Sequence, residues 1–254
     1  MIRCEGLTKQ FGSKRVLDGV DLEIHEGETM VIIGRSGEGK SVLLKHIALL
    51  IKPDNGKLWI DDDEVSGFSE KELDRIRPKI GLLFQMAALF DSLTVLENVG
   101  FGLIQHSGLS MEEITKKVEE NLKMVQLEGI MDKKPAELSG GMKKRVGLAR
   151  AIATKPKIIL YDEPTTGLDP ITADAINDLI ISMKDELQVT GVAVTHDMVS
   201  AYKIADRIAM LNKGKIIAVG TPDEIRSSSD ERVQQFIHGH AKGPLTDINE
   251  RVGA

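Results

Sequence analysis

The fold is decided by Val31-Ile32-Ile33-Gly34-Arg35-Ser36-Gly37-Glu38-Gly39-Lys40-Ser41-Val42. The β-branched run stops at Gly34, and from Lys40 onward apolar residues recur at helical spacing. The stretch therefore predicts a strand, a glycine loop and a helix, in that order. Residues 34–41 match the pattern G-x-x-x-x-G-K-S in the strand-loop-helix setting that the pattern requires.

Such a loop is typical of phosphate binding. Its glycines let consecutive backbone N–H groups surround phosphate oxygens, and the start of the helix adds a partial positive charge. We expect Lys40 to reach the terminal phosphates and Ser41 to offer its hydroxyl to Mg²⁺. A flexible glycine turn is the alternative, but the full match in context favours a nucleotide. The residues assigned to it are Gly34, Arg35, Ser36, Gly37, Glu38, Gly39, Lys40, Ser41 and Val42.

Two carboxylates follow a second apolar run. Asp162 and Glu163 come directly after residues 158–161, so both should emerge at the carboxyl end of a strand, where open α/β sheets bind ligands. Asp162 fits a magnesium-side acid, and Glu163 fits a catalytic general base for the attacking water. Alone, such a pair is more often a solvated turn. Beside a phosphate loop the functional interpretation is favoured.

His196 follows a third apolar run, residues 192–195. We expect it on the same rim, within reach of a terminal phosphate, with a catalytic role in sensing and positioning. The alternative is a histidine that only packs at a strand end. No second histidine stands at metal-ligand spacing, so the sequence gives no reason to expect zinc.

A second anion site is predicted at Leu138-Ser139-Gly140-Gly141-Met142. Ser139 can cap a helix whose exposed N–H groups, flanked by two glycines, would bind an anion. One chain thus offers two phosphate-binding helix ends. Because a triphosphate has one terminal phosphate to be held from opposite sides, the second set of contacts is expected to come from another copy of the chain.

The remaining pattern predicts an α/β protein. Residues 16–24, 29–33 and 57–60 predict strands of a mainly β amino-terminal region. Apolar runs at 158–161, 192–195 and 208–211, separated by helical segments, predict a buried parallel sheet. Helical spacing over 111–125 and after Gly141 predicts a helical subdomain, and the chain beyond residue 229 predicts a polar tail.

The composition excludes several classes of protein. The 254 residues carry 33 Lys and Arg against 39 Asp and Glu, a formal charge of -6, which argues against dedicated binding of nucleic acid. Cys4, the single cysteine, can form neither an internal disulfide nor a cysteine-rich zinc site. No uncharged apolar stretch approaches the ~18 residues that span a bilayer. We expect a cytoplasmic protein that serves any membrane from outside.

These motifs, in this order, resemble the ATPase subunits of ABC transporters. The resemblance rests on the phosphate loop, Gln85, Leu138-Ser139-Gly140-Gly141, Tyr161-Asp162-Glu163-Pro164, Gly167-Leu168-Asp169 and His196. It implies a P-loop NTPase fold with a RecA-like, mostly parallel sheet core, an amino-terminal antiparallel β region and an inserted helical subdomain. The implied ABC ATPase domain covers residues 1–237, with the helical subdomain at about 87–155 and a polar tail over 238–254.

The resemblance also implies ATP and Mg²⁺ as ligands and a head-to-tail homodimer. Two ATP molecules would lie between the phosphate loop of one protomer and Ser139, Gly140 and Gly141 of the other. Asp169 would contact the opposite protomer. Members of the family commonly carry glutamine where Met142 stands, and methionine forms no strong hydrogen bond, so this contact with the nucleotide differs here.

Three further assignments come from the resemblance. Phe11 would stack on adenine, keeping the aromatic face of the more usual tyrosine. Gln85 would contact Mg²⁺ and relay the nucleotide state to a multispanning permease, which would dock between Met86 and Val95. Residues 86–90 of that segment are apolar or small and could equally pack in the core. The implied metal set is Ser41, Gln85 and Asp162.

Within the family, residues 39–45 and 84–93, with the Ser-Gly-Gly-Met sequence, resemble the Mla subfamily of intermembrane phospholipid transport. Residues 232–236 and 243–245 are similar as well. We therefore expect an ATPase on the cytoplasmic face of the inner membrane, working with a permease and lipid-binding subunits. An importer for a small solute such as an amino acid, or an ABC-type ATPase without transport, remains the alternative.

Overall fold

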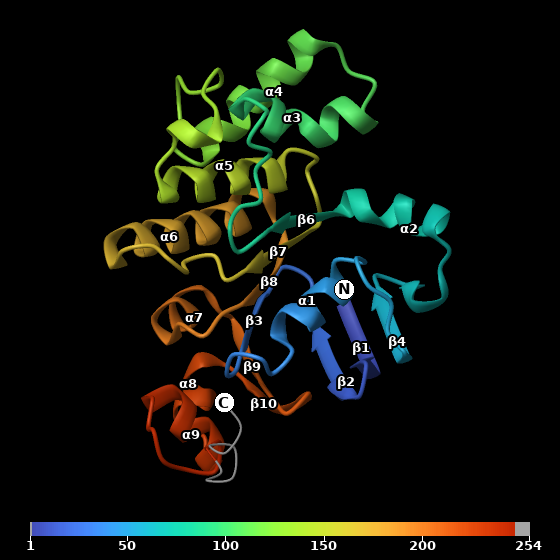
Figure 1. The fold of residues 1–254 in the computed structure, drawn as a ribbon, viewed down its shortest axis with the longest axis vertical. Coiled ribbons are helices and arrows are strands. Elements are labelled where there is room, and N and C mark those ends of the chain that lie inside the picture. Colours follow the sequence, from blue (N-terminus) through green and yellow to red (C-terminus); the bar gives the residue numbers. More distant parts are fainter. Residues whose placement is uncertain (1, 247–254) are drawn as a thin grey trace.

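The structure, a computed structural model, describes residues 2–246 and has a mainly parallel sheet at its centre (Figure 1). The strand order is β10-β9-β3-β8-β7-β6, in which β9 to β6 run parallel and β10 pairs antiparallel with β9. The strands are β3 (Thr29–Ile33), β6 (Ile80–Leu83), β7 (Ile158–Asp162), β8 (Thr190–Val194), β9 (Arg207–Asn212) and β10 (Lys215–Gly220).

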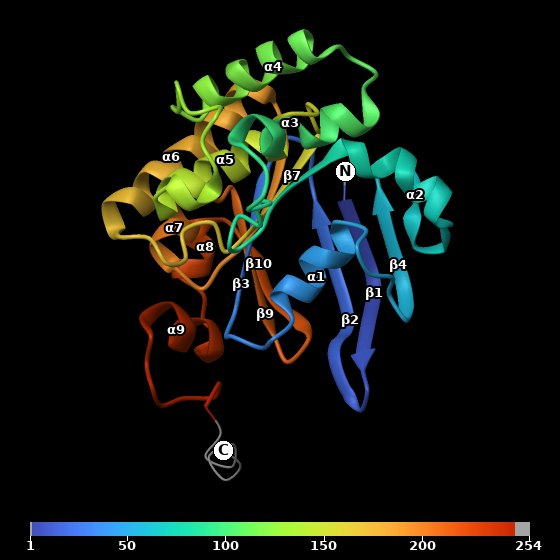
Figure 2. The ribbon, with the colours of Figure 1, turned by 45° about the horizontal axis from the view of Figure 1, so that its top comes forward.

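A second, antiparallel sheet in the order β2-β1-β4-β5 lies beside the first. Its strands are β1 (Ile2–Phe11), β2 (Lys14–Ile24), β4 (Asn55–Ile60) and β5 (Asp63–Glu64). Helix α1 (Lys40–Ile47) contacts both sheets and lies between them (Figure 2). Alternate residues of β3 therefore face different cores: Met30 and Ile32 pack on the α1 side, and Val31 and Ile33 on the opposite side.

The opposite side of the central sheet is covered by helices, and α3, α4 and α5 lie next to one another in Figure 1. This group, α3 to α5, is held together by a core that includes Val99, Val118 and Val146. Besides α1, the helices of the described residues are α2 (Glu70–Ile76), α3 (Val95–His106), α4 (Met111–Met124), α5 (Gly140–Ile152), α6 (Pro170–Leu187), α7 (Met198–Ile204), α8 (Pro222–Arg226) and α9 (Glu231–His238). Short 3-10 turns lie at Val65–Gly67, Arg77–Lys79 and Pro135–Glu137.

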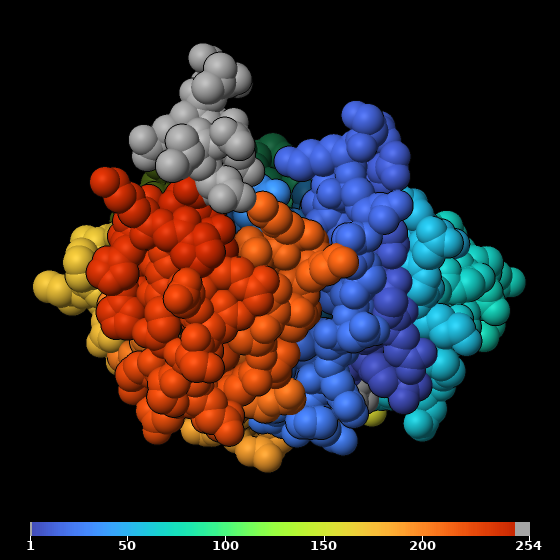
Figure 3. Space-filling model, turned by 90° about the horizontal axis from the view of Figure 1, so that it is seen from below, coloured from blue at the N-terminus to red at the C-terminus, as the bar shows by residue number. Residues whose placement is uncertain are grey.

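The predicted fold class is confirmed, since strands form over all six predicted runs and helices over both predicted segments. Beyond residue 229 the described chain is not uniformly polar. Helix α9 forms there with Val233 buried, and Leu245 is 5% exposed. The Gln235 side-chain oxygen accepts the Leu245 N–H at 2.7 Å, which fastens the end of the described chain to α9. Figure 3 shows this region in red beside the part of the chain coloured orange, which precedes it in the sequence. The division of the chain at residue 238 stays a prediction.

Candidate nucleotide site

The phosphate loop connects β3 to α1 and lines a cavity of about 300 Å³. Two of its glycines are required by the backbone. Gly39 has φ 105° at the start of α1, and a Cβ there would lie 2.9 Å from the Val16 carbonyl oxygen; at Gly34, φ 151°, a Cβ would lie 2.3 Å from the Leu211 oxygen. The cavity is lined by Val16, Ser36, Gly37, Gly39, Lys40, Ser41, Val42, Gln85, Glu163 and His196.

Lys40 is buried under the loop. Its Nζ donates to the carbonyl oxygens of Gly34 at 2.7 Å and Arg35 at 3.1 Å. Burial lowers the pKa of Lys40, while the carboxylates of Glu163, Glu38 and Asp162 act in the opposite direction. The cation is thus held at the cavity by acceptors that a phosphate could replace.

Arg35 and Glu38 direct their side chains to the carboxyl-terminal part of the chain. The guanidinium of Arg35 donates to the Leu245 carbonyl oxygen at 2.5 Å, and Glu38 accepts the main-chain N–H of Lys213. Neither residue is among those lining the cavity in the described chain. Their contribution to a phosphate site would therefore come from the backbone.

Ser41 and Asp162 meet where β3 and β7 end. The Ser41 hydroxyl donates to Asp162 Oδ1 at 2.9 Å. Because the two strands are parallel members of one sheet, their carboxyl ends share an edge. A hydroxyl and a carboxylate oxygen are ligands that suit Mg²⁺, so this pair fits the predicted metal position.

Glu163 points into the cavity from a left-handed backbone conformation, φ 48°. Its Oε1 lies 3.0 Å from His196 Nδ1, and its Oε2 accepts the hydroxyls of Thr166 at 3.0 Å and Thr195 at 3.4 Å. Glu163 is 8% exposed. The structure therefore pairs His196 with the carboxylate that the sequence assigns as the base, at the rim of the predicted phosphate site.

The segment after β6 is held by two cations that sequence reasoning missed. Lys144 Nζ donates to the carbonyl oxygens of Gln85 at 2.5 Å and Glu163 at 2.9 Å. Arg150 donates to the carbonyl oxygens of Ala87 at 2.5 Å and Ala88 at 2.7 Å. Burial lowers the pKa of Lys144 to about 8. The available signal was a lysine on the apolar face of the helix that follows Gly141.

Three predicted contacts lie outside this cavity in the described chain. Ser139 caps α5, with its Oγ accepting the Met142 N–H at 3.3 Å. Asp169 caps α6, with Oδ1 accepting the N–H groups of residues 171 and 172, and hydrogen bonds from Thr172 lower its pKa. Both caps are exposed, as an assignment to a second protomer requires. Phe11 is 49% exposed and also lies outside the cavity.

The predicted docking run divides between core and surface. Ala87 and Val95 are buried, whereas Met86 is 84% and Phe90 46% exposed. The Phe90 ring lies 4.9 Å from that of Phe101 on α3. An apolar surface therefore begins directly after Gln85.

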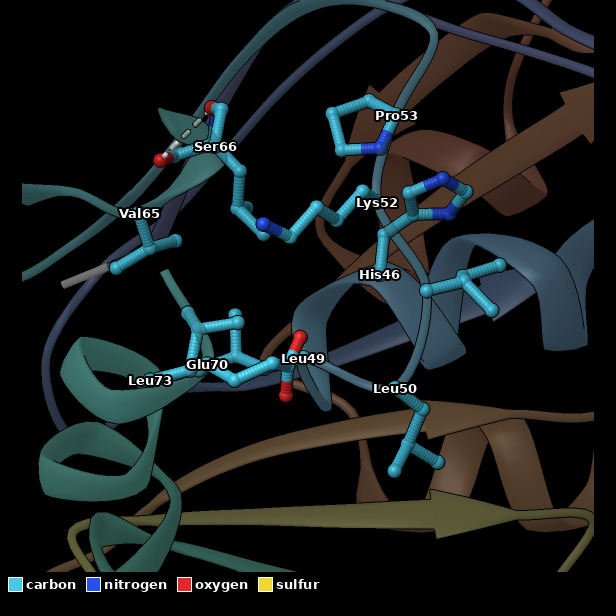
Figure 4. Close-up of a pocket in the computed structure, with 11 residues that line it drawn as sticks. His46, Leu49, Leu50, Lys52, Pro53, Val65, Ser66, Glu70 and Leu73 are labelled. Atoms are coloured by element: carbon cyan, nitrogen blue, oxygen red, sulfur yellow. Dashed lines mark hydrogen bonds between the residues drawn. The ribbon is translucent and has the colours of Figure 1, made fainter. Parts of the chain in front are cut away.

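A separate cavity of about 50 Å³ lies at the end of α1, away from the phosphate loop (Figure 4). Its wall includes Leu49, Leu58, Val65 and Leu73, all buried. His46 Nδ1 donates to the Val42 carbonyl oxygen at 2.7 Å, and burial lowers the pKa of its imidazole. This cavity is too small for a nucleotide.

A mainly parallel sheet whose central strand enters a glycine loop and a helix, with carboxylates at the same edge, defines a P-loop nucleoside triphosphatase. Residues 17–166 match the family described as ABC transporter. The chain belongs to that family, and it is an ATP hydrolase of the ABC type.

Several known proteins are similar over nearly the whole chain. Protein TRIGALACTOSYLDIACYLGLYCEROL 3 of Arabidopsis thaliana is 42% identical over 96% of this chain and 75% of its own. The intermembrane phospholipid transport system ATP-binding protein MlaF of Haemophilus influenzae is 37% identical over 96% of this chain and 93% of its own. The solved dimer of the ATP-binding cassette MJ0796 with ADP and Pi has a TM-score of 0.81 and 39% identity, covering 87% of this chain and 99% of that one.

Proposed function

We propose that the chain hydrolyses MgATP to power the movement of phospholipid between membranes, as a homodimer bound peripherally to the cytoplasmic face of the inner membrane. The assignment of ATP hydrolysis is supported by the side chains that meet where the parallel strands end. There the Ser41 hydroxyl meets Asp162, and the carboxylate of Glu163 meets His196 beside the phosphate loop. No helix within residues 2–246 is long and apolar enough to cross a membrane.

In this proposal the loop backbone and Lys40 bind the triphosphate. Ser41, Asp162 and Gln85 would hold Mg²⁺, which supplies charge neutralisation between the terminal phosphates. Glu163 accepts a proton from the attacking water, and His196 holds that carboxylate and contacts the terminal phosphate. Phe11 is assigned to the adenine.

The dimer follows from the exposed caps. The residues at these caps are not among those that line the cavity of their own chain, so we assign them to the nucleotide site of the partner protomer: Ser139, Gly140, Gly141 and Asp169. The dimeric cassettes among the similar structures support this arrangement.

Transport of phospholipid is supported by the name of the MlaF relative and by the Mla-like motifs. An importer for a small solute is the second candidate, because the glycine betaine transport protein OpuAA of Bacillus subtilis is 40% identical over 91% of this chain. In both cases a multispanning partner would dock on the surface that begins at Met86. Copurifying that partner and identifying the lipid or solute bound to it separates the two candidates.

The hydrolytic role is tested with Glu163→Gln. Removing a general base typically lowers the rate ~10² to 10⁴-fold, whereas the phosphate loop is unchanged, so ATP should still bind and an ATP-bound dimer should accumulate. Glu120→Gln, on an exposed part of α4, is the matched control. If the steady-state hydrolysis rate of Glu163→Gln were within about threefold of the wild-type rate, Glu163 would be excluded as the general base, because its loss should lower the rate at least ~10²-fold.

A further inference from the structure

Lys144 is a buried cation that connects two segments of the nucleotide site. It lies in the second turn of α5, whose N-cap is Ser139, and it is 5% exposed. Its Nζ donates to the main-chain carbonyl oxygens of Gln85 and Glu163. One ammonium group thus contacts the segment after β6 and the segment after β7.

A purely structural role explains this lysine poorly. Burying an ammonium group is costly, and an apolar side chain of similar length would fill the same space without that cost. The second cation of the helix, Arg150, already holds the neighbouring carbonyl oxygens of Ala87 and Ala88. Lys144 adds contacts to Gln85 and Glu163, and only the contact to Glu163 reaches a segment other than the one that Arg150 already holds.

The backbone of Glu163 is tied on both sides. Its N–H donates to the Val194 carbonyl oxygen at 3.0 Å, and its own carbonyl oxygen accepts from Lys144 Nζ at 2.9 Å and from the Thr166 N–H at 3.3 Å. Held by these bonds, the residue adopts the left-handed conformation that directs its carboxylate into the cavity. Without Lys144 the carbonyl oxygen would keep only the longer bond, from Thr166, so this uncommon conformation would be held less firmly.

We propose that Lys144 is a positioning residue for ATP hydrolysis, fixing the backbone of Glu163 relative to Gln85 and linking both to the helix that begins at Ser139. The proposal rests on the proposed role of Glu163 as the base. A movement of α5, when a partner's nucleotide contacts its start, would reach Glu163 and Gln85 through the same ammonium group. Lys144 itself is not required to touch ATP.

The test uses Lys144→Met in the full chain, with Lys144→Arg as the conservative variant. Lys123→Met on an exposed part of α4 is the matched control. Because misplacement of a catalytic group by about 1 Å can cost ~10²-fold, we expect Lys144→Met to lower kcat about 10-fold or more with KM for ATP within about threefold of wild type. Lys144→Arg should recover most of kcat, and Lys123→Met should match wild type.

The deciding measurement is a double-mutant cycle in single-turnover hydrolysis. If Lys144 acts through the Glu163 carboxylate, Lys144→Met should change the rate less than about threefold in the Glu163→Gln background, because the group it positions is gone. A full loss in that background, or a loss confined to KM, would overturn the proposal. Near-wild-type hydrolysis by Glu163→Gln alone would instead refute the role of Glu163.

If Lys144→Met does not fold, Lys144→Gln replaces it, since its amide retains two N–H donors without the charge. The same cycle then applies: kcat should fall about threefold at unchanged KM in the wild-type background, and the single-turnover rate should be equal with and without Lys144→Gln in the Glu163→Gln background. Equal kcat for wild type and Lys144→Gln, together with an unchanged rate in the Glu163→Gln background, would count against any need for the buried cation.

Discussion

The proposed docking surface after Gln85 can be tested at Phe90. The side chain is 46% exposed, and its ring lies 4.9 Å from the ring of Phe101. Its backbone is held independently, because its N–H donates to Asn98 Oδ1 at 2.8 Å and its carbonyl oxygen accepts from Asn98 Nδ2 at 3.1 Å. Phe90→Glu should therefore change the surface while leaving the backbone in place.

The expected loss of stability is moderate. Giving up the ring pair costs about 0.5–1.5 kcal/mol, and exposing a half-buried aromatic side chain costs about 1 kcal/mol more. At about 2–4 °C per kcal/mol for a chain of this size, the melting temperature should fall by roughly 3–10 °C. Phe90→Ala should fall by a similar amount, because it loses the same contacts.

Docking should separate the two variants. A carboxylate buried without a partner in an apolar contact costs roughly 2–7 kcal/mol or more, and each 1.4 kcal/mol is about tenfold in affinity. Phe90→Glu should therefore bind the membrane partner at least about tenfold more weakly than Phe90→Ala. Val219→Glu, at a residue that is 41% exposed on β10, is the control for an added surface charge.

The assay is paired: the melting temperature of the isolated subunit, and its copurification with the membrane protein. Wild-type yield of the complex with Phe90→Glu, accompanied by a large drop in melting temperature, would show that Phe90 belongs to the core and would refute the docking assignment.

Three further predictions concern the fold and its titrating groups. Gly39→Ala should lower the free energy of unfolding in urea by about 1–3 kcal/mol because of its left-handed backbone, and by about 1–3 kcal/mol more because the new Cβ contacts Val16. Gly37→Ala, which has open space around its Cβ, should lose only the backbone part. Equal losses for the two variants would contradict the steric argument. Cys4 is buried and its pKa is raised to about 12, so its alkylation by iodoacetamide at about pH 8 should be roughly 10³-fold slower in the native chain than in urea. The pKa of His46 is lowered in the folded chain, so the unfolded chain binds a proton more readily at this histidine. As the pH decreases below about 6.5, the free energy of unfolding should therefore decrease by up to about 1.4 kcal/mol per pH unit. The variant His46→Gln should lack this contribution to the pH dependence.

Much of the fold follows from patterns that act over a few residues. The β-branched run, the glycines and the amphipathic start of α1 each favour the same local structure, so residues 29–47 could be assigned with their chemistry. The predicted cap at Ser139 is local in the same sense, because its side chain accepts an N–H three residues ahead. Asp169 caps α6 in the same way, although the sequence pattern did not predict that cap.

Features that depend on distant contacts were not predicted. Strand β6 lies at the edge of the sheet and is only four residues long, so its pattern is weak. Helix α9 is short and polar, with Val233 and Gln235 as its buried residues, and Leu245 covers it from ten residues beyond Gln235. Lys144 contacts Gln85, which is 59 positions away in the sequence, and Glu163, which is 19 positions away. No periodic pattern in the sequence reveals such contacts.

The two adjacent carboxylates illustrate how the site depends on one backbone angle. Successive residues of a strand point to opposite faces, so Asp162 and Glu163 could not both serve the same edge if β7 simply continued. The strand pairs through Asp162, opposite Val194, and ends there. Glu163 then takes φ 48°, so Asp162 keeps its contact with Ser41 while Glu163 turns toward His196. Because that conformation is uncommon for a side chain of this size, the direction of the Glu163 carboxylate depends on the bonds that hold its backbone, which join it to Val194, Thr166 and Lys144.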